Sequence, residues 1–263
     1  MQSETAETGA SDHAPLISTR LLLVAAGLVL LLALASLAIS YAGRIYGERL
    51  SLGGHSESRE IVTITIGRDR LALPANAIRF EQQRIGGPAE QVDLYLLWPE
   101  MTGYEQGLRR RFDDLSQEQS LIFLQISQST MSRDMSGRVD PIYAHLLSST
   151  AERGPGGLSM RRFEPGTGYD GEALLTASHA DGDDYAVRCL LPADAAQVTD
   201  GDCQRDIHVG EDLTVLYRFS SRMLGDWAAI DQAVRSYVST RATPLPNETS
   251  HKMRPNPSTK GSS

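Results

Sequence analysis

The sequence predicts an α+β domain, a mostly antiparallel sheet with short helices and a C-terminal amphipathic helix, preceded by one N-terminal transmembrane helix. Three observations support this prediction: an uncharged apolar run, several short runs of alternating or β-branched residues, and a helical apolar period near the end of the chain. Many strands interrupted by short helices are typical of α+β domains whose helices cover one face of a sheet.

Residues 21–42 form an unbroken apolar run without a charged side chain, between Arg20 and Arg44. A helix of about 22 residues spans a bilayer core, where the backbone must satisfy its own hydrogen bonds. The run is too long and too uniformly apolar for a buried core helix. A cleaved signal peptide is the alternative, because residues 40–42 (SYA) resemble a cleavage site, but signal peptides usually have a shorter apolar stretch. We expect an uncleaved anchor.

The flanking charges and the cysteines point to different orientations of this helix. More arginines follow the helix than precede it, which would keep the C-terminal domain in the cytoplasm, but long domains translocate largely regardless of charge. The only two cysteines, Cys189 and Cys203, lie close together in one predicted hairpin, as expected for a disulfide in an oxidising compartment. Two buried free thiols are the alternative. We expect a disulfide, a cytoplasmic N-terminus and a C-terminal domain outside the membrane.

The chain divides into five predicted segments. They are a disordered leader (1–20), the transmembrane helix (21–42), a Gly/Ser-rich linker (43–59), a soluble α+β domain (60–241) and a disordered Pro/Ser/Thr/Asn-rich tail (242–263). The leader carries a formal charge of −2 and the tail +2, so the segments between them keep the whole −8. Such a domain does not hold polyanions by bulk charge, and we expect no nucleic acid partner.

The elements of the domain follow from local patterns. Alternating or β-branched runs predict strands over 61–66, 70–73, 92–98, 121–126, 158–163, 172–178, 185–191, 206–209 and 213–219. The first two strands form a hairpin across residues 67–69. Residues 107–115 are a weak helix or a loop, and a short helix runs through Leu147 after Asp140 as N-cap and Pro141 as first helical residue. Apolar residues recurring every three or four positions predict a final helix over 223–239.

The loop that follows the strand over 92–98 is the candidate partner-contact surface. Trp98, Met101 and Tyr104 lie in a Pro- and Gly-bearing loop, and exposed aromatic side chains are enriched at protein interfaces. The equally favoured alternative is that this loop covers the end of the sheet. Arg109-Arg110-Arg111, just beyond, is a basic cluster for anionic lipids or an acidic partner, or a solvated face compensated by the two following aspartates.

No motif predicts catalysis, a metal site or a cofactor. Two turns are rich in acidic residues and histidine, but their spacing lacks the EF-hand pattern and is ordinary turn chemistry; the residues are His179, Asp181, Asp183 and Asp184 in the first, and Asp200, Asp202 and His208 in the second. His145 is expected at the core or its boundary, and the chain has no G-x-S-x-G nucleophile elbow. We therefore assign no catalytic, cofactor-binding or metal-ligating residue.

Three strings, IGRDRLALPANAIRFEQQR (66–84), VDLYLLWPEMTGY (92–104) and YRFSSRMLGDWAAIDQAVRSYV (217–238), resemble a family of uncharacterised single-pass envelope proteins of α-proteobacteria. The resemblance implies a bacterial inner membrane and a periplasmic domain, and it carries over no site residues. We expect a non-enzymatic protein-interaction or envelope-organising factor whose partners are the lipid bilayer, through the anchor, and an unidentified protein. The alternative is a membrane-tethered envelope hydrolase whose site is assembled from distant His, Ser and Asp residues.

Overall fold

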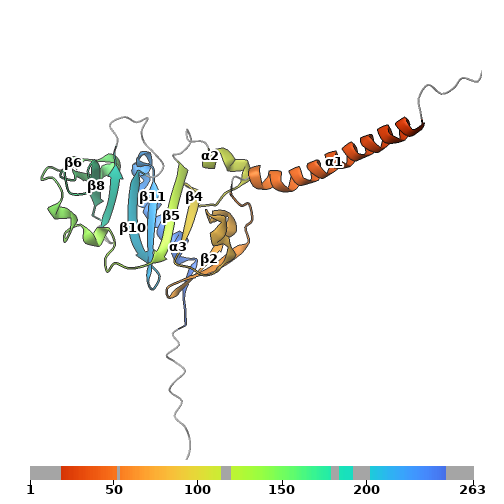
Figure 1. Ribbon diagram of the computed structural model, residues 1–263. Coiled ribbons are helices and arrows are strands. Elements are labelled where there is room, and N and C mark those ends of the chain that lie inside the picture. Colours follow the sequence, from red (N-terminus) through yellow and green to blue (C-terminus); the bar gives the residue numbers. More distant parts are fainter. Residues whose placement is uncertain (1–18, 52–53, 114–119, 179–183, 192–201, 247–263) are drawn as a thin grey trace, which may run out of the picture. The chain divides into compact units, whose positions relative to one another are not determined.

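The computed structural model describes residues 19–51, 54–113, 120–178, 184–191 and 202–246, in two compact units. The first unit, Met1–Gly53, contains the long helix α1, and the second, Gly54–Ser263, contains the described strands (Figure 1). The predicted leader (through residue 18) and the predicted disordered tail from residue 247 lie outside the described residues.

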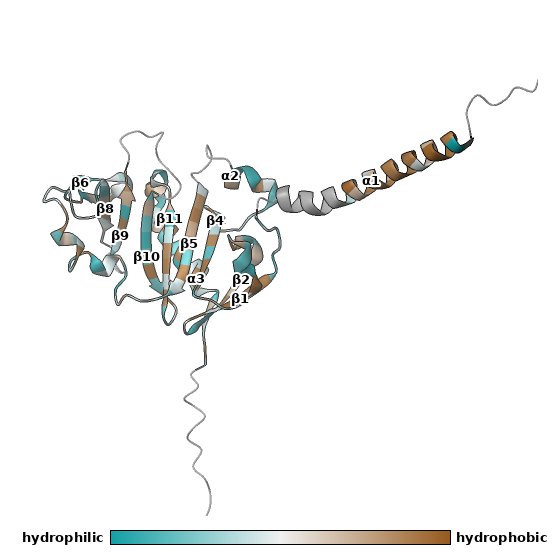
Figure 2. Ribbon diagram, in the orientation of Figure 1, coloured by the Kyte–Doolittle hydropathy of each residue, from teal (hydrophilic) through white to brown (hydrophobic). Residues whose placement is uncertain are grey.

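Helix α1 (Thr19–Ser51) confirms the predicted N-terminal apolar helix. Its stretch Arg20–Tyr41 has 22 residues with a mean hydropathy of 2.8, and Figure 2 shows it in the brown of hydrophobic residues along most of its length. None of these residues is buried. By length and composition it is able to cross a membrane. The helix continues into the predicted linker. Gly43 and Gly47 lower the helical propensity there, but each keeps its backbone N–H donor, and so neither ends the helix.

An eight-stranded sheet forms most of the second unit, and its neighbouring strands are antiparallel. The strands follow one another across the sheet in the order β4 (Gln91–Leu97), β5 (Leu121–Gln128), β11 (Leu213–Phe219), β10 (Cys203–Val209), β9 (Tyr185–Leu190), β8 (Glu172–Ala177), β7 (Ser159–Arg162) and β6 (Glu152–Arg153). The β9–β10 pairing, in the middle of the sheet, covers only two residues of each strand.

A second, four-stranded sheet is built around the predicted N-terminal hairpin. Its order is β12 (Ala242–Pro244), β2 (Asp69–Pro74), β1 (Ile61–Ile66) and β3 (Gly87–Pro88). β12 pairs with β2, so the ordered domain extends beyond residue 241, where the sequence had placed its end. The polar composition of these residues gave no strand signal, because the pairing depends on a partner about 170 residues away.

Two α-helices and several 3₁₀ helices complete the described part of this unit. The α-helices are α2 (Arg109–Asp113) and α3 (Trp227–Ser239). The 3₁₀ helices are Ala75–Ala77, Glu81–Ile85, Gln106–Leu108, Ser136–Arg138, Tyr143–His145, Pro155–Gly157 and Ser221–Asp226. The predicted short helix ending at Leu147 is thus a single 3₁₀ turn, and the predicted final helix begins as a 3₁₀ helix, with α-helical structure from Trp227.

The main core lies between one face of the large sheet, the β1–β2 hairpin and α3. Buried side chains alternate along β4, β5 and β11, which gives one apolar face per strand. Helix α3 contributes Ile230, Val234 and Val238, three or four residues apart as the sequence predicts. The predicted α+β class is confirmed, with a mostly antiparallel sheet and a C-terminal amphipathic helix.

A smaller apolar cluster covers the opposite face of the sheet, but only over β8 and β9. It consists of Met135, Tyr143, Leu147, Phe163, Leu174 and Ala186. The segment between β5 and β6 supplies its first three members, and so this segment covers that end of the sheet. Over β4, β5 and β11 the same face carries exposed or half-buried side chains, and we call this region the open face: Gln91, Asp93, Phe123, Gln125, Ser127, Thr214, Leu216 and Arg218. Tyr95, Leu97 and Leu121, at one end of these strands, are buried.

Candidate functional site

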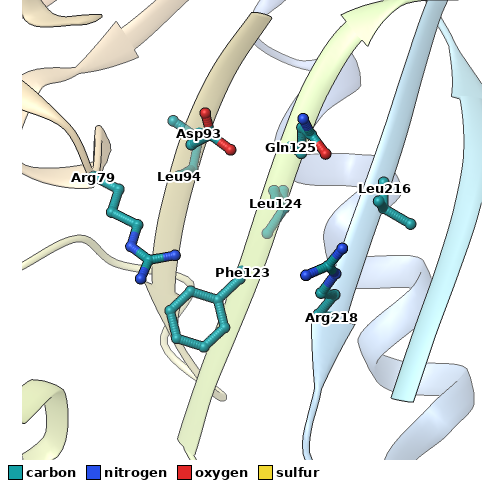
Figure 3. A pocket seen from close by; sticks show the side chains of 8 residues that line it. All are labelled: Arg79, Asp93, Leu94, Phe123, Leu124, Gln125, Leu216 and Arg218. Atoms are coloured by element: carbon teal, nitrogen blue, oxygen red, sulfur yellow. The ribbon is translucent and has the colours of Figure 1, made fainter. Parts of the chain in front are cut away.

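A pocket lies on the open face. It has a volume of about 260 Å³. Its lining comes from β4, β5 and β11 and from Arg79, which precedes the 3₁₀ helix Glu81–Ile85. The lining residues are Arg79, Asp93, Leu94, Phe123, Leu124, Gln125, Leu216 and Arg218. Figure 3 shows the two guanidinium groups on either side of the Phe123 ring, with Asp93 and Gln125 toward the other end of the pocket. The strand register explains this arrangement, since Phe123 pairs with Arg218 while Gln125 pairs with both Asp93 and Leu216.

Arg79 is held by aromatic rings. Its guanidinium carbon lies 5.0 Å from the centre of the Phe123 ring and 5.2 Å from that of Phe80. Both distances are within the range of cation–π attraction, which orients the group without using its N–H donors. Among the described residues, no carboxylate pairs with Arg79 or Arg218.

The polar groups at the other end of the pocket are satisfied by one another. The Asp93 carboxylate accepts hydrogen bonds from the side-chain amides of Gln83 (2.8 Å) and Gln91 (3.0 Å). Gln125 in turn donates to the side-chain oxygen of Gln91 at 2.9 Å. The pocket therefore combines an acidic end, whose carboxylate is hydrogen-bonded to side-chain amides, with an end where two arginines have no carboxylate partner in the described part of the chain.

The predicted contact residues Trp98, Met101 and Tyr104 belong to the packing of the domain. Trp98 and Met101 are half-buried against the main core, and Tyr104 has no exposed surface. Tyr104 is therefore not an exposed side chain. Its position agrees with the other prediction for this loop, that it covers the end of the sheet. The contact role of the other two residues stays a prediction.

Tyr104 belongs to an aromatic cluster at the β4 edge. The His55 ring stacks on it with centroids 4.4 Å apart, and His55 also lies 2.9 Å from the Tyr95 hydroxyl and 3.1 Å from an Asp113 oxygen. Burial raises the pKa of Tyr95 to about 12, so its phenol is protonated and able to donate to His55. Phe112 packs edge-on against these rings. The cluster is a packing feature that closes one end of the open face.

The basic cluster over 109–111 is largely compensated. Arg109 pairs with Asp113 at 2.8 Å, and Arg111 pairs with Glu100 at 2.9 Å and donates to the Trp98 carbonyl oxygen. Arg110 is exposed. Arg111 therefore fixes the loop after β4, whereas the Arg109 pair lies within α2.

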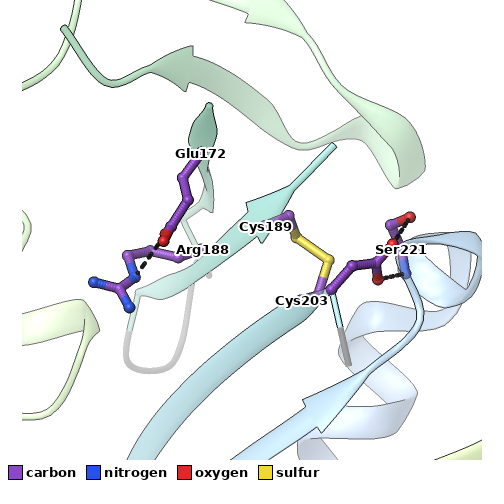
Figure 4. Close-up of a disulfide and its surroundings, with 6 residues drawn as sticks. Glu172, Arg188, Cys189, Cys203 and Ser221 are labelled. Atoms are coloured by element: carbon purple, nitrogen blue, oxygen red, sulfur yellow. Dashed lines mark hydrogen bonds and ion pairs between the residues drawn. A yellow bond between two sulfur atoms is a disulfide. The ribbon is translucent and has the colours of Figure 1, made fainter. Parts of the chain in front are cut away.

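The predicted disulfide is present between Cys189 and Cys203, which face each other across β9 and β10 (Figure 4). Arg188, beside it, forms an ion pair with Glu172 of β8 at 3.2 Å. The bridge coincides with the two-residue β9–β10 pairing, so it joins the two halves of the large sheet across this short ladder.

The histidines do not form a catalytic arrangement in the described part of the chain. His208 Nε2 lies 3.2 Å from Ser129 Oγ, but the Ser129 hydroxyl donates its proton to the Met131 carbonyl oxygen. Among the described residues no carboxylate pairs with His208, so this contact lacks the group that would orient a general base. His145 is exposed, so its predicted place at the core or boundary is wrong.

The acidic turns give no metal site within the residues described. The structure shows no group of three or more His, Cys, Asp or Glu side chains able to hold a metal ion there. His179, Asp181, Asp183 and Asp200 lie outside the described residues. Asp202 contacts Ser221, accepting hydrogen bonds from its amide and hydroxyl, and thus ties β10 to the segment before α3.

The comparisons with known proteins do not assign a family. No family model matches the chain, and no curated protein matches it. An immunity protein of the Stenotrophomonas maltophilia type IV secretion system is 17% identical, with a TM-score of 0.48, covering 72% of this chain and 96% of its own. The Neisseria meningitidis iron-regulated outer membrane lipoprotein FrpD is 10% identical, with a TM-score of 0.45, covering 72% of this chain and 97% of its own. At these values neither resemblance assigns a function to this chain.

The open-face pocket was not found by reasoning from the sequence. Phe123 lies in a run, LIFLQISQ, that reads as a buried strand, and Arg79 and Arg218 are isolated arginines. The signal was the alternation within that run, since Phe123, Gln125 and Ser127 share one face and two of them are polar. That alternation indicates a face that is not fully buried.

Proposed function

We propose that this protein is a non-enzymatic domain tethered to a bacterial inner membrane, which binds a protein partner on the periplasmic side. The observation that supports it most is the open face, where a half-buried phenylalanine lies between two exposed arginines without carboxylate partners among the described residues. Aromatic and arginine side chains carry much of the binding energy in protein interfaces.

The tether is helix α1. Its exposed apolar side chains favour a lipid environment over packing within the chain, and the stretch is longer than the apolar part of most signal peptides. Intact-mass measurement of the protein extracted from membranes tests this. We expect the mass of the uncleaved chain. The mass of a chain that begins after residue 42 would show a cleaved signal peptide.

The periplasmic side is supported by the Cys189–Cys203 disulfide, because such bonds persist in oxidising compartments and are rare in the cytosol. Protease added to intact spheroplasts is expected to degrade the domain as readily as protease added to permeabilised ones. Protection in the intact spheroplasts alone would place the domain in the cytoplasm.

Photo-crosslinking in living cells tests partner binding. A photoreactive amino acid in place of Gln125, on the open face, is expected to give a discrete adduct with another protein. The same amino acid in place of Arg162, exposed on β7 at the far end of the sheet, is the matched control and should give none. No adduct at position 125, or the same adduct at both positions, would contradict the proposal.

The resemblance to single-pass envelope proteins of α-proteobacteria is part of this proposal. It supports the bacterial inner membrane as the location and an interaction or organising role for the domain. Identification of the adduct formed at position 125 by mass spectrometry tests the role, since an envelope protein is expected and a cytosolic protein would contradict it.

A further inference from the structure

We propose that the open-face pocket binds an acidic segment of the partner protein, with a carboxylate of that segment between the guanidinium groups of Arg79 and Arg218. This inference rests on the proposed function, which it deepens by naming the surface and the chemistry of the partner. The apolar neighbour of that carboxylate packs on Phe123, which lies between the two arginines (Figure 3).

Arg79 is preorganised for this role. The rings of Phe80 and Phe123 both lie about 5 Å from its guanidinium carbon, 5.2 and 5.0 Å respectively, and restrict its orientation. Because ring contacts leave the N–H groups free, a carboxylate gains charge-assisted hydrogen bonds without displacing an existing partner. Less side-chain freedom is lost on binding than for an unrestrained surface arginine.

The charge of the pocket selects an anion. Two guanidinium groups face one carboxylate, that of Asp93, whose oxygen already accepts from Gln83 and Gln91. Asp93 and Phe123 belong to different rows of cross-strand pairs, so the acidic group is separated from the arginine end. The pocket is thus locally basic, although the formal charge of the whole chain is −8.

The size of the pocket favours side chains over a cofactor. Its volume is about 260 Å³, below the roughly 300–1,000 Å³ of most small-molecule sites. Leu94 and Leu124 also line it, between the open-face residues of β4 and β5, and their own side chains are buried in the main core. A space of this kind fits one or two side chains of a segment that crosses the strands.

The occupant is another protein and not the chain's own C-terminal stretch. Residues 242–263 carry a formal charge of +2, so the arginine end repels them. Phe80, 44% exposed, extends the apolar surface beside Arg79 and widens the contact available to a partner segment. The complement of this surface is a segment with an acidic residue next to an apolar or aromatic one.

A binding experiment with the full-length protein in detergent tests the chemistry directly. The probe is the peptide Gly-Glu-Phe-Glu-Gly amide with fluorescein attached to its N-terminal amine, and its matched control has Gln in place of both Glu residues. We expect the acidic peptide to bind about tenfold more tightly than the Gln peptide, as for loss of a charge-assisted hydrogen bond. Equal affinity of the two peptides, or no binding of either, would overturn the proposal.

Matched protein variants test whether Arg79 and Arg218 form the binding site. Arg79→Gln combined with Arg218→Gln is expected to weaken binding of the acidic peptide about tenfold, while Arg110→Gln, an exposed arginine on α2, leaves it unchanged. An unchanged melting temperature shows that the double variant is folded. An equal loss in both variants would indicate nonspecific attraction and overturn the assignment.

Two further outcomes would show that the pocket binds something other than a partner protein. Vesicles containing phosphatidylglycerol that bind with the same Arg79 and Arg218 dependence, and displace the peptide, would identify a lipid surface instead. A dimer of the wild type that dissociates in the double variant, measured by light scattering, would identify a second copy of this chain. Either result overturns the proposal, and the absence of both, together with peptide binding, supports it.

The cellular crosslink at position 125 separates this inference from the proposed function. Loss of the adduct in the double variant, but not in Arg110→Gln, supports both. An adduct that persists in the double variant leaves the proposed function standing and overturns the acidic-segment inference. If no adduct forms even in the wild type, the proposed function fails, and the peptide experiment alone decides whether the pocket binds carboxylates.

Discussion

Arg205 of β10 is a buried charge whose partners come from three directions. Its exposed fraction is 1%, and it donates to Asp231 of α3, to the Ser136 hydroxyl and to the Ala186 carbonyl oxygen. Asp231 also accepts from Tyr217 and Arg235. Because both charges are paired and hydrogen-bonded, the network ties α3 to the sheet and to the segment between β5 and β6.

Removal of the Asp231 carboxylate is the residue-scale test of this network. Asp231→Ala leaves the Arg205 guanidinium buried without its counter-charge, and we expect a loss of about 3 to 5 kcal/mol in the free energy of unfolding, measured in urea. Glu105→Ala, which breaks the exposed pair with Arg59, is the control and should cost less than about 1 kcal/mol. Similar losses in both variants would show that the network does not stabilise the fold.

The same carboxylate predicts a pH dependence. Burial alone would raise the pKa of Asp231, but Arg205, Arg235 and the Tyr217 hydroxyl favour the charged form, and the net effect lowers the pKa. A lowered folded-state pKa gives stability that is present above the unfolded value, about 3.9, and is lost as the pH falls through the folded value. We expect urea midpoints to fall below about pH 4, and less steeply in Asp231→Asn. An equal slope in both proteins would contradict this.

At the scale of elements, the large sheet consists of two halves. One half is β4–β5–β11–β10 and the other is β9–β8–β7–β6, and they meet where only two residues of each central strand pair. The disulfide is located at this junction, and the Arg188–Glu172 ion pair lies next to it within the second half. The strands that line the open-face pocket all belong to the first half.

The junction predicts a local effect of removing the disulfide. For Cys189→Ala combined with Cys203→Ala we expect a loss of about 3 kcal/mol, as for a closed loop of this length. Hydrogen exchange should rise most in β6–β9, while β4, β5 and β11 stay protected. Reduction of the wild type should reproduce the pattern. A uniform rise over the whole sheet would show that the bridge does not hold the junction in particular.

At the scale of the whole molecule, the two units have separate physical roles. Helix α1 buries none of its stretch Arg20–Tyr41, whereas the second unit has its own core between sheet, hairpin and α3. The contacts of residues 55–59 with the domain, including hydrogen bonds from Asn76 to Ser58 and from Tyr95 to His55, place the start of the folded unit before residue 60. The predicted linker is therefore part helix and part domain.

Separate units predict that the domain folds without the helix. A chain of residues 54–263 should be soluble without detergent and should unfold at the same temperature as the full-length protein, measured by circular dichroism. A chain of residues 60–263 lacks the His55 contacts and should unfold at a lower temperature. If residues 54–263 aggregate or melt earlier than the full-length protein, the helix contributes to the fold of the domain.

Local patterns predicted several elements well, and for physical reasons. The alternation in residues 61–66 and the apolar period of α3 indicate which side of each element is buried. Both patterns depend only on residues a few positions apart in the chain. The strands β6 and β3 were missed because each has two residues, too few for a period. The sequence left two equally favoured positions for Tyr104, exposed or covering the sheet end, because its burial depends on His55 and Phe112, which the sequence does not connect to it.

The sequence by itself determined the apolar helix, the main strands, the final helix and the cysteine pair, because each of these depends on neighbours close in the chain. Only the tertiary structure decided which face of the sheet stays open and that Arg79, Phe123 and Arg218 meet on it. These residues come from segments far apart, and their encounter is fixed by strand order and register. Such pairings are non-local, so no short stretch of sequence specifies them.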